Sequence, residues 1–263
     1  MNDFYSDTKT KPSHAMLEYA LGRTFGDEQQ DEDPTTLELC ERVAHLLGKE
    51  SAVFLPSGTM CNEIAITVQT SPGDEIICGR SSHIINFEGG APAAMSGVMI
   101  HPLDGKYGQF TEEDVRQALR PESRYMPISR MLCAEQTANL GGGAVWQLEK
   151  LDSVAQVAKN SGLSTHLDGA RLLNACVKTG ISAAHYSREY DSCWIDFTKG
   201  LGAPMGAVLA GSAEFIQAAW RVKQRIGGAM RQSGVIASYC LYALENNVER
   251  LAEDHALASR ISE

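Results

Sequence analysis

The sequence of 263 residues lacks any excess of positive charge, since 23 lysines and arginines stand against 33 aspartates and glutamates. The net charge of −10 repels nucleic acid and anionic lipid, and no basic tail or stripe offsets it. We therefore expect neither nucleic acid nor a membrane as a partner. A small molecule and further copies of the same chain are the partners that this composition favours.

Three other signals are missing. No apolar run is long enough to span a bilayer, and the opening stretch MNDFYSDTKTKP has no apolar signal region. The seven cysteines include no C-x-x-C pair, which indicates reduced thiols in a cytoplasmic protein. The histidines form no H-E-x-x-H or similar ligand pattern, so no metal is expected.

What the chain does contain is an alternation of apolar strands and amphipathic helices. Helices are predicted over residues 36–48, 60–70, 112–120, 147–162, 213–226 and 233–263. Strands are predicted over residues 52–56, 74–78, 98–102, 128–135 and 163–168, with two more inside 191–212. This order predicts an α/β fold with a mostly parallel sheet flanked by helices, and ligands at the carboxyl ends of the strands.

Composition also suggests domain boundaries. Residues 1–35 are polar and acidic, which predicts an extended N-terminal arm. Residues 36–245 are expected to form one large α/β domain. Residues 246–263 continue the last predicted helix, and we expect them to lead to a small C-terminal domain that is absent or truncated here.

The stretch Asp191 to Ser212, DSCWIDFTKGLGAPMGAVLAGS, consists of an apolar strand, a glycine-rich break and a second apolar strand. Its one lysine, Lys199, is the only charged residue between Asp196 and Glu214. A lysine at a strand edge with little water around it loses part of the solvation that favours its ammonium form. Its amine then becomes available for Schiff-base chemistry. For an isolated T-K-G tripeptide, a surface lysine in a turn is the favoured interpretation, and only the rest of the chain favours a Schiff-base lysine.

Two further segments carry groups suited to a cofactor with a phosphate and a pyridine ring. Ser57, Gly58 and Thr59 form a turn between a predicted strand and a predicted helix, where free amides and the helix dipole can hold a phosphate. Asp168, in THLDGAR, ends a predicted strand and can keep a pyridine nitrogen protonated. Arg171 offers a two-pronged donor that suits a substrate carboxylate.

Each of these residues also has a purely structural interpretation. The S-G-T turn could cap an ordinary helix, and Asp168 with Arg171 could close a turn as an ion pair. His83 follows a predicted strand, where its imidazole could stack on a cofactor ring and move protons or serve only packing. His166 lies inside a predicted strand, and there the structural role is favoured.

Taken together, these segments make the sequence similar to a known family. SDTKTKP, FLPSGTMCNEIA, SSHIINFEGGAPA, HLDGARLLNA, DFTKGLGAPMGAVLAG, GGAMRQSG and NNVERLAEDH occur in the order and at the spacing of the L-threonine aldolase family. The resemblance covers essentially the whole chain and implies the large domain of a fold-type I pyridoxal phosphate enzyme. The implied reaction is that of a carbon-carbon lyase, which cleaves L-threonine or L-allo-threonine to glycine and an aldehyde.

The resemblance also implies a role for each matched residue on the cofactor side. Lys199 is expected to bind pyridoxal 5'-phosphate covalently, His83 to stack over its ring and Asp168 to pair with its pyridine nitrogen. The residues expected around the phosphate are Ser57, Gly58, Thr59 and Thr198.

On the substrate side, the resemblance implies that Ser6 and Arg171 bind the carboxylate, with Arg171 also beside the cofactor. Arg231, in GGAMRQ, is expected to reach a cofactor phosphate at a dimer interface. The family is cytoplasmic and forms homodimers or homotetramers whose sites lie between subunits.

Two departures from the family pattern fall on the substrate side. Where the family has Y-G-D-D-P, residues 30–34 are Q-D-E-D-P, so Gln30 replaces an aromatic hydroxyl. Where the family has T-H-N, residues 137–139 are T-A-N, so Ala138 replaces a histidine. These changes leave open a β-eliminating lyase, an amino-acid racemase or an aldolase for bulky aldehydes. The expected truncation of the C-terminal domain leaves open a paralogue that binds the cofactor, or pairs with a full-length subunit, without turnover.

Overall fold

The computed structural model describes residues 5–263, and a seven-stranded sheet forms its centre. The strand order is β1-β7-β6-β5-β4-β2-β3. The strands are β1 Ser51–Leu55, β2 Glu75–Gly79, β3 Met99–Leu103, β4 Ser129–Glu135, β5 Ser164–Asp168, β6 Ser192–Asp196 and β7 Ala207–Gly211. β7 is antiparallel to both of its neighbours, and the other pairs are parallel. The predicted mostly parallel α/β sheet is confirmed.

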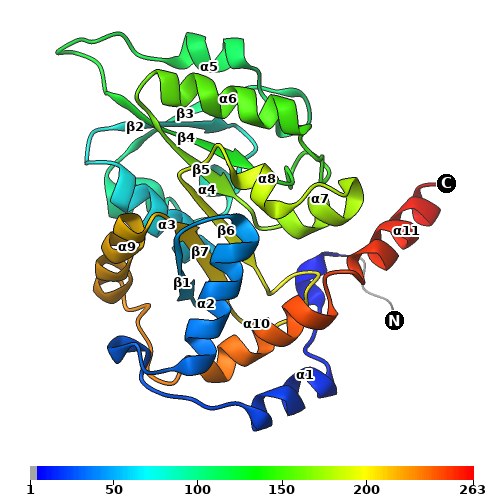
Figure 1. Cartoon of the computed structure of the whole chain (residues 1–263). Helices are drawn as coiled ribbons and strands as arrows, with labels where there is room; N and C mark the ends of the chain where they lie inside the picture. The colour runs from blue at the N-terminus through cyan, green and yellow to red at the C-terminus, as the bar shows by residue number, and fades with distance from the viewer. Residues whose placement is uncertain (1–4) are drawn as a thin grey trace.

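Helices cover both faces of this sheet (Figure 1). They are α1 His14–Tyr19, α2 Pro34–Leu47, α3 Gly58–Gln69, α4 His83–Asn86, α5 Glu112–Ala118, α6 Leu148–Asn160, α7 Leu172–Thr179, α8 Ala183–Ser187, α9 Ala213–Arg225, α10 Gly234–Asn246 and α11 Leu251–Ser262. Short 3₁₀ turns cover Asp7–Lys9, Ala20–Gly22, Glu28–Gln30 and Lys106–Gly108, and a π turn covers Pro92–Ser96.

Two apolar clusters separate the layers, because successive side chains of a strand point to opposite faces. Ile76 packs in the cluster beneath α3, α4 and α9. Its neighbour Ile77 packs in the larger cluster beneath α2, α5, α6, α7, α8 and α10. The inner strands are therefore buried on both sides, as parallel strands with helical crossovers require, while the edge strand β3 is partly exposed.

The start of α2 differs by two residues from the prediction. Asp33 caps the helix: its carboxylate accepts a hydrogen bond from the Thr36 amide at 2.9 Å, and Pro34 takes the first helical position. The end of the helix agrees with the predicted range, since Gly48 follows its last residue in the left-handed region with φ of 62°.

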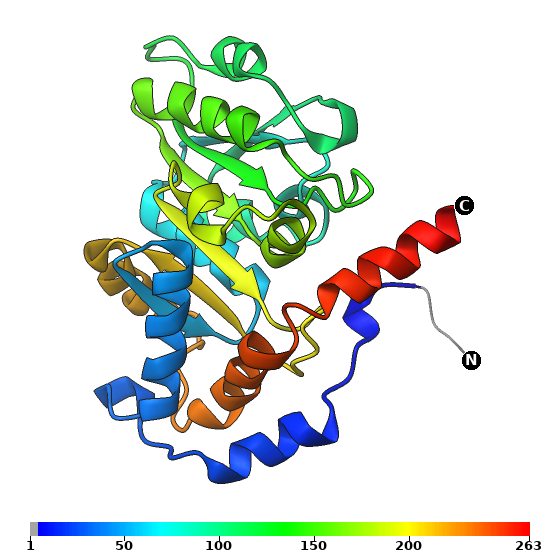
Figure 2. The same cartoon turned by 45° about the vertical axis from the view of Figure 1, so that its right-hand side comes forward.

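The arm before α2 is not simply extended, so that prediction is wrong for residues 14–22. Ser13 accepts a hydrogen bond from the Met16 amide at 3.1 Å and starts α1, and the Met16 side chain is buried. α1 packs against α10, and Figure 2 shows the arm running around the outside of the helical layer. Burial of Met16 overrides the polar composition of this segment.

The single helix predicted over residues 233–263 is also wrong, because the chain turns between α10 and α11. Asn247 ends α10, and its side-chain amide donates to the Leu201 carbonyl at 2.7 Å. α11 then projects away from the sheet (Figure 2).

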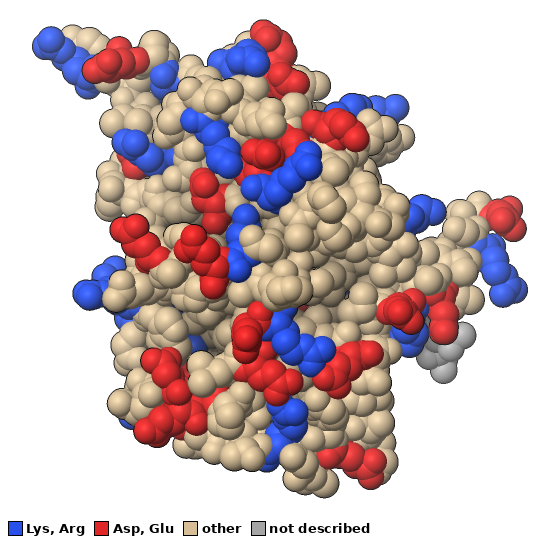
Figure 3. All heavy atoms as spheres, in the orientation of Figure 1, with Lys and Arg blue, Asp and Glu red and all other residues tan. Residues whose placement is uncertain are grey.

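The surface carries both signs of charge. On the face shown in Figure 3, acidic and basic side chains are interspersed. Within residues 5–263 no helix is long and apolar enough to cross a bilayer, and no cluster of three or more histidines, cysteines or acidic residues could hold a metal ion.

Candidate active site

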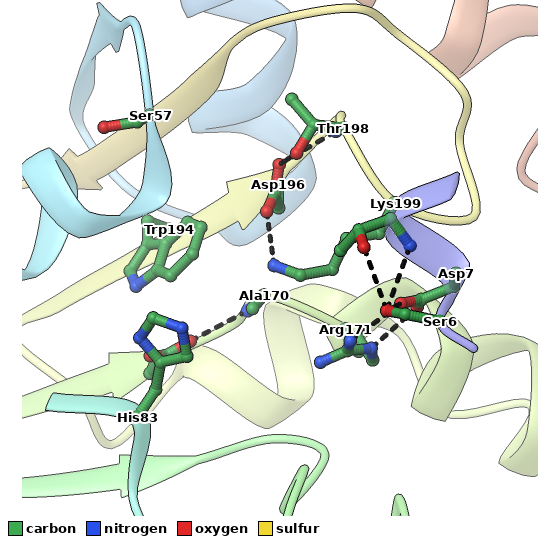
Figure 4. Close-up of polar contacts among 12 residues, drawn as sticks. Ser6, Asp7, Ser57, His83, Ala170, Arg171, Trp194, Asp196, Thr198 and Lys199 are labelled. Atoms are coloured by element: carbon green, nitrogen blue, oxygen red, sulfur yellow. Dashed lines mark hydrogen bonds and ion pairs between the residues drawn. The ribbon is translucent and has the colours of Figure 1, made fainter. Parts of the chain in front are cut away.

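The candidate site lies where four adjacent strands end. His83 comes shortly after β2, while Glu135, Asp168 and Asp196 are the last residues of β4, β5 and β6. Because the carboxyl ends of parallel strands meet at one edge of the sheet, residues far apart in the chain converge there. Figure 4 shows the polar groups of this pocket.

Lys199 lies in the turn between β6 and β7, and its side chain is 15% exposed. Its amine forms an ion pair with Asp196 and lies 5.7 Å from the centre of the Trp194 ring. Trp194 in turn donates to the Asn62 oxygen at 2.8 Å, and the Asn62 amide donates to Asp168 at 3.0 Å, so one chain of contacts joins Lys199 to Asp168. The two residues at the centre of the sequence prediction are therefore brought together.

Side chains from both ends of the chain hold the backbone of the lysine turn. The Thr10 hydroxyl donates to the Lys199 carbonyl at 2.7 Å. Arg250 donates to the Gly200 carbonyl at 3.0 Å, and Asn247 donates to the Leu201 carbonyl at 2.7 Å. Three successive carbonyls are thus satisfied by residues outside the turn, which fixes the direction of the lysine side chain.

Asp168 is buried at 5% exposure and oriented by two donors. Its Oδ2 accepts from the Asn62 amide at 3.0 Å, and its Oδ1 accepts from the Ala170 backbone amide at 3.0 Å. Burial raises the pKa of Asp168. A protonated ring nitrogen placed against this carboxylate would stabilise its charged form, so the buried carboxylate fits a pyridine cofactor.

Asn62 of α3 connects the carboxylate to the core. Its oxygen accepts from Trp194 Nε1 at 2.8 Å and from His166 Nε2 at 3.0 Å. His166 is fully buried, and desolvation lowers its pKa to about 3. The ring is therefore neutral and accepts from the Ser192 hydroxyl at 2.8 Å, which confirms a structural histidine.

His83 begins α4 and faces two carboxylates. Its backbone amide donates to Glu135 Oε2 at 2.8 Å, and its Nδ1 lies 2.8 Å from Glu88 Oε1. The hydrogen bond with Glu88 raises the pKa of His83 against the opposing effect of burial. The ring packs against Phe87 with centroids 5.4 Å apart, so its position is set from two sides.

The amino end of α3 packs against Trp194, whose ring also lies near the Lys199 amine, and Figure 4 shows Ser57, Trp194 and Lys199 together. The Ser57 hydroxyl caps α3, and Gly58 is the first helical residue. A Cβ at Gly58 would lie 2.2 Å from Trp194 Cη2, so only glycine allows this approach. The amide and hydroxyl of Thr198 both donate to Asp196 Oδ1, at 2.8 and 2.7 Å.

Arg171 already binds a carboxylate in this structure. Its Nε and Nη2 donate to the two oxygens of Asp7 at 2.7 and 2.8 Å, in the fork-to-fork geometry expected for a substrate. Although burial opposes ionisation, Arg171 lowers the pKa of Asp7, so the pair is charged at neutral pH. Ser6 lies beside this pair and accepts from the Thr8 amide at 3.2 Å.

Three residues discussed from the sequence lie outside this group. Arg231 is exposed in the loop between α9 and α10, where it pairs with Asp27 at 2.7 Å. Gln30 is exposed at the end of a short 3₁₀ turn. Ala138 is buried in the loop after β4, where its backbone pairs with Ala144.

An α/β sheet that places a lysine amine, a buried carboxylate and the amino end of a helix at one edge defines the large domain of a fold-type I enzyme. The family model for beta-eliminating lyases matches residues 3–263. The low specificity L-threonine aldolase of Escherichia coli K12 is 37% identical, over 100% of this chain and 78% of its own length. Low-specificity L-threonine aldolase 1 of Arabidopsis thaliana is 38% identical over 99% of this chain and 74% of its own.

Solved structures show the same fold. A putative L-allo-threonine aldolase from Listeria monocytogenes aligns with a TM-score of 0.78 and 26% identity, over 94% of this chain and 70% of that one. The threonine aldolase of Leishmania major aligns with a TM-score of 0.85 and 21% identity, over 97% and 76%. The chain belongs to the beta-eliminating lyase family and, within it, to the L-threonine aldolases, as the sequence predicted.

Proposed function

We propose that this protein cleaves L-threonine, L-allo-threonine and related β-hydroxy-α-amino acids to glycine and an aldehyde, with pyridoxal 5'-phosphate as its cofactor. The observation that carries the proposal is that Lys199 and Asp168 lie at the carboxyl edge of the sheet and are joined through Trp194 and Asn62. Membership of the L-threonine aldolase family supports the substrate class.

The residues of the pocket fit the cofactor. When bound, the cofactor withdraws into its ring the electron pair of the bond that breaks. Lys199 would hold it covalently, and Asp168 would keep its ring nitrogen protonated. His83 would cover the ring, and its Nε2 remains available for proton movement because Nδ1 contacts Glu88. The groups that would hold its phosphate are the turn at residues 57–59 and Thr198.

Substrate orientation would come from Arg171 and Ser6. A two-pronged hold on the carboxylate decides which bond of Cα stands perpendicular to the cofactor ring, and only that bond is weakened. Because Asp7 occupies the fork of Arg171 in this structure, the substrate carboxylate must displace it or share it.

We further infer a cytoplasmic homodimer or homotetramer. The cytoplasmic location is supported by seven cysteines that carry no disulfide. Assembly with the site between subunits is supported by Arg231, whose side chain is 62% exposed and pairs with Asp27 rather than with a residue of the candidate site.

The test is aldehyde release by the purified full chain from L-threonine and L-allo-threonine, with product analysis on a panel of β-substituted serines. We expect glycine and acetaldehyde, and a visible absorbance band that borohydride bleaches. Lys199→Ala should lose the band and the activity, whereas the exposed Lys178→Ala should keep both.

Other outcomes would assign the protein differently. A retained band without turnover of any substrate identifies a non-catalytic cofactor-binding paralogue. Ammonia with the corresponding 2-oxo acid, such as 2-oxobutyrate from L-threonine, in place of glycine identifies a β-eliminating lyase, and the epimer inverted at Cα identifies a racemase.

A further inference from the structure

Two buried glutamates lie directly behind His83. Glu63, on α3, is 2% exposed, and Glu88, in the segment after α4, is 6% exposed. Both oxygens of Glu63 and Oε2 of Glu88 have no hydrogen-bond donor among residues 5–263. Isolated buried carboxylates are costly, so three unpartnered oxygens in one place require an explanation.

The explanation is that the two carboxyl groups face each other. No side chain within residues 5–263 donates to either oxygen of Glu63 or to Oε2 of Glu88, and the hydrogen bond that joins the two groups needs a proton on one of them. Two adjacent carboxylates cannot both be ionised cheaply in a desolvated site, and the favoured state is one acid donating to one carboxylate. Burial and the charge of Glu88 raise the pKa of Glu63 to about 8, so Glu63 is the acid at neutral pH.

Glu88 transmits the state of this pair to the active site. Its Oε1 contacts His83 Nδ1 at 2.8 Å and accepts from the Asn62 amide at 2.7 Å. The same Asn62 amide donates to Asp168. A carboxylate at position 88 therefore requires the hydrogen of neutral His83 to be on Nδ1.

We propose that Glu63 and Glu88 form a carboxylic acid–carboxylate pair which shares one proton and which, through Glu88, fixes the ring tautomer and the protonation state of His83. Glu63 is thus a positioning residue, since it touches neither cofactor nor substrate. Its significance for catalysis rests on the role of His83 in the proposed function, but the pair itself does not.

The other charges around this network are few. The negative charges of Asp168, on β5, and Glu135, on β4, raise the pKa of His83, as Glu88 does. The positive charge of Lys199 favours the ionised form of Asp168, and Lys199 also forms an ion pair with Asp196. Cys133, which faces both glutamates from β4, has a pKa raised well above its ordinary value by burial and stays neutral. Above pH 8 the pair gains a second negative charge, and His83 then holds its proton more tightly.

The experiment follows the ring nitrogens of His83 by NMR in the full chain labelled with ¹⁵N-histidine, between about pH 5 and pH 10. The His83 signals are assigned by their loss in His83→Gln. In the unmodified chain we expect the Nδ1–H tautomer and a second inflection of the His83 shifts near pH 8, where Glu63 loses its proton. Neither cofactor nor substrate is needed, so the result is independent of the proposed aldolase activity.

Two substitutions separate positioning from packing. Glu63→Gln keeps a donor toward Glu88 and should retain the tautomer while losing the inflection near pH 8. Glu63→Leu removes the donor and should move the His83 titration to higher pH, because Glu88 then no longer shares its charge with an acid. If Glu63→Leu does not fold, the inflection near pH 8 in Glu63→Gln alone decides whether the proposal holds.

Asp152→Asn is the matched control, since it neutralises a buried carboxylate of α6 with one unpartnered oxygen and should leave His83 unchanged. An Nε2–H tautomer in the unmodified chain overturns the proposal. The proposal is also overturned if the unmodified chain shows no inflection of the His83 shifts near pH 8, or if that inflection persists in Glu63→Gln.

Discussion

Glu63→Gln should make the protein more stable at neutral and alkaline pH. Glu63 carries a pKa of about 8 in the folded chain against an ordinary value of 4.5. Between these values the folded state keeps a proton that the unfolded state has lost, so the free energy of unfolding falls as pH rises. The stabilising contribution of the protonated group is complete below about pH 4.5 and is lost by pH 8.

The magnitude follows from about 1.4 kcal/mol for each pH unit, which gives an upper limit of about 3.4 kcal/mol at pH 7. Relaxation of the site and water entry reduce this, and we expect about 1–3 kcal/mol of added stability in the glutamine variant at pH 7. The gain should fall below about 1 kcal/mol near pH 5 and vanish only below about pH 4, where Glu63 of the unmodified chain is largely protonated in both the folded and the unfolded state.

Urea unfolding at fixed protein concentration, at about pH 5, pH 7 and pH 9, measures this difference. Glu214→Gln, on the exposed side of α9, is the control and should change stability by less than about 0.5 kcal/mol at every pH. A loss of stability in Glu63→Gln that is equal at all three pH values would refute the reasoning, because it would show that Glu63 is ionised throughout.

Three other substitutions test contacts described above. Asp7→Asn weakens the pair between residue 7 and Arg171, so the substrate carboxylate competes better for the Arg171 guanidinium. Steady-state kinetics should show a KM for the amino acid lower by about two- to fivefold, with little change in kcat. Gly58→Ala should cost about 1–3 kcal/mol in urea unfolding, since its Cβ meets the indole, and Trp194→Phe should recover part of that loss. Lys223→Met leaves Glu28 charged in the core and should cost about 3–5 kcal/mol, whereas adding Glu28→Gln should restore most of it.

The main features of the sheet and the site were predictable because they depend on local patterns. Apolar runs bounded by small residues located β1 to β5 to within one residue and placed β6 and β7 inside residues 191–212, and β5 and β6 end at the expected carboxylate and before the expected lysine turn. The lysine and the aspartate converge because the parallel arrangement forces their strand ends to one edge. Their convergence follows from topology, which the alternation of elements predicted.

The residues behind the site could not be found in this way. Asn62 looks like any polar residue of a helix, and its partners at positions 88, 166, 168 and 194 are distant in sequence. Glu63 and Glu88 would each be expected on a solvated helix face. Asp196 did carry a signal, because Asp-x-Thr favours a turn in which the carboxylate accepts from the residue two positions on, as Thr198 does.

The break between α10 and α11 and the helix in the arm were missed for a related reason. Asn247 ends a helix only because Leu201 offers a carbonyl to its side chain, and the fold supplies that partner. Ser13 starts α1 because Met16 finds a buried site. Tertiary contacts decided both boundaries against local composition.

The three hydrogen bonds that hold the lysine turn, from Thr10, Asn247 and Arg250, affect the order in which the chain folds during synthesis. Thr10 leaves the ribosome early, but Asn247 and Arg250 emerge more than two hundred residues later. Since domains begin to fold as they are translated, the sheet can assemble while the turn that bears the reactive amine is still held from one side only. The nascent chain would therefore bind its cofactor late, after the rest of the sheet has folded.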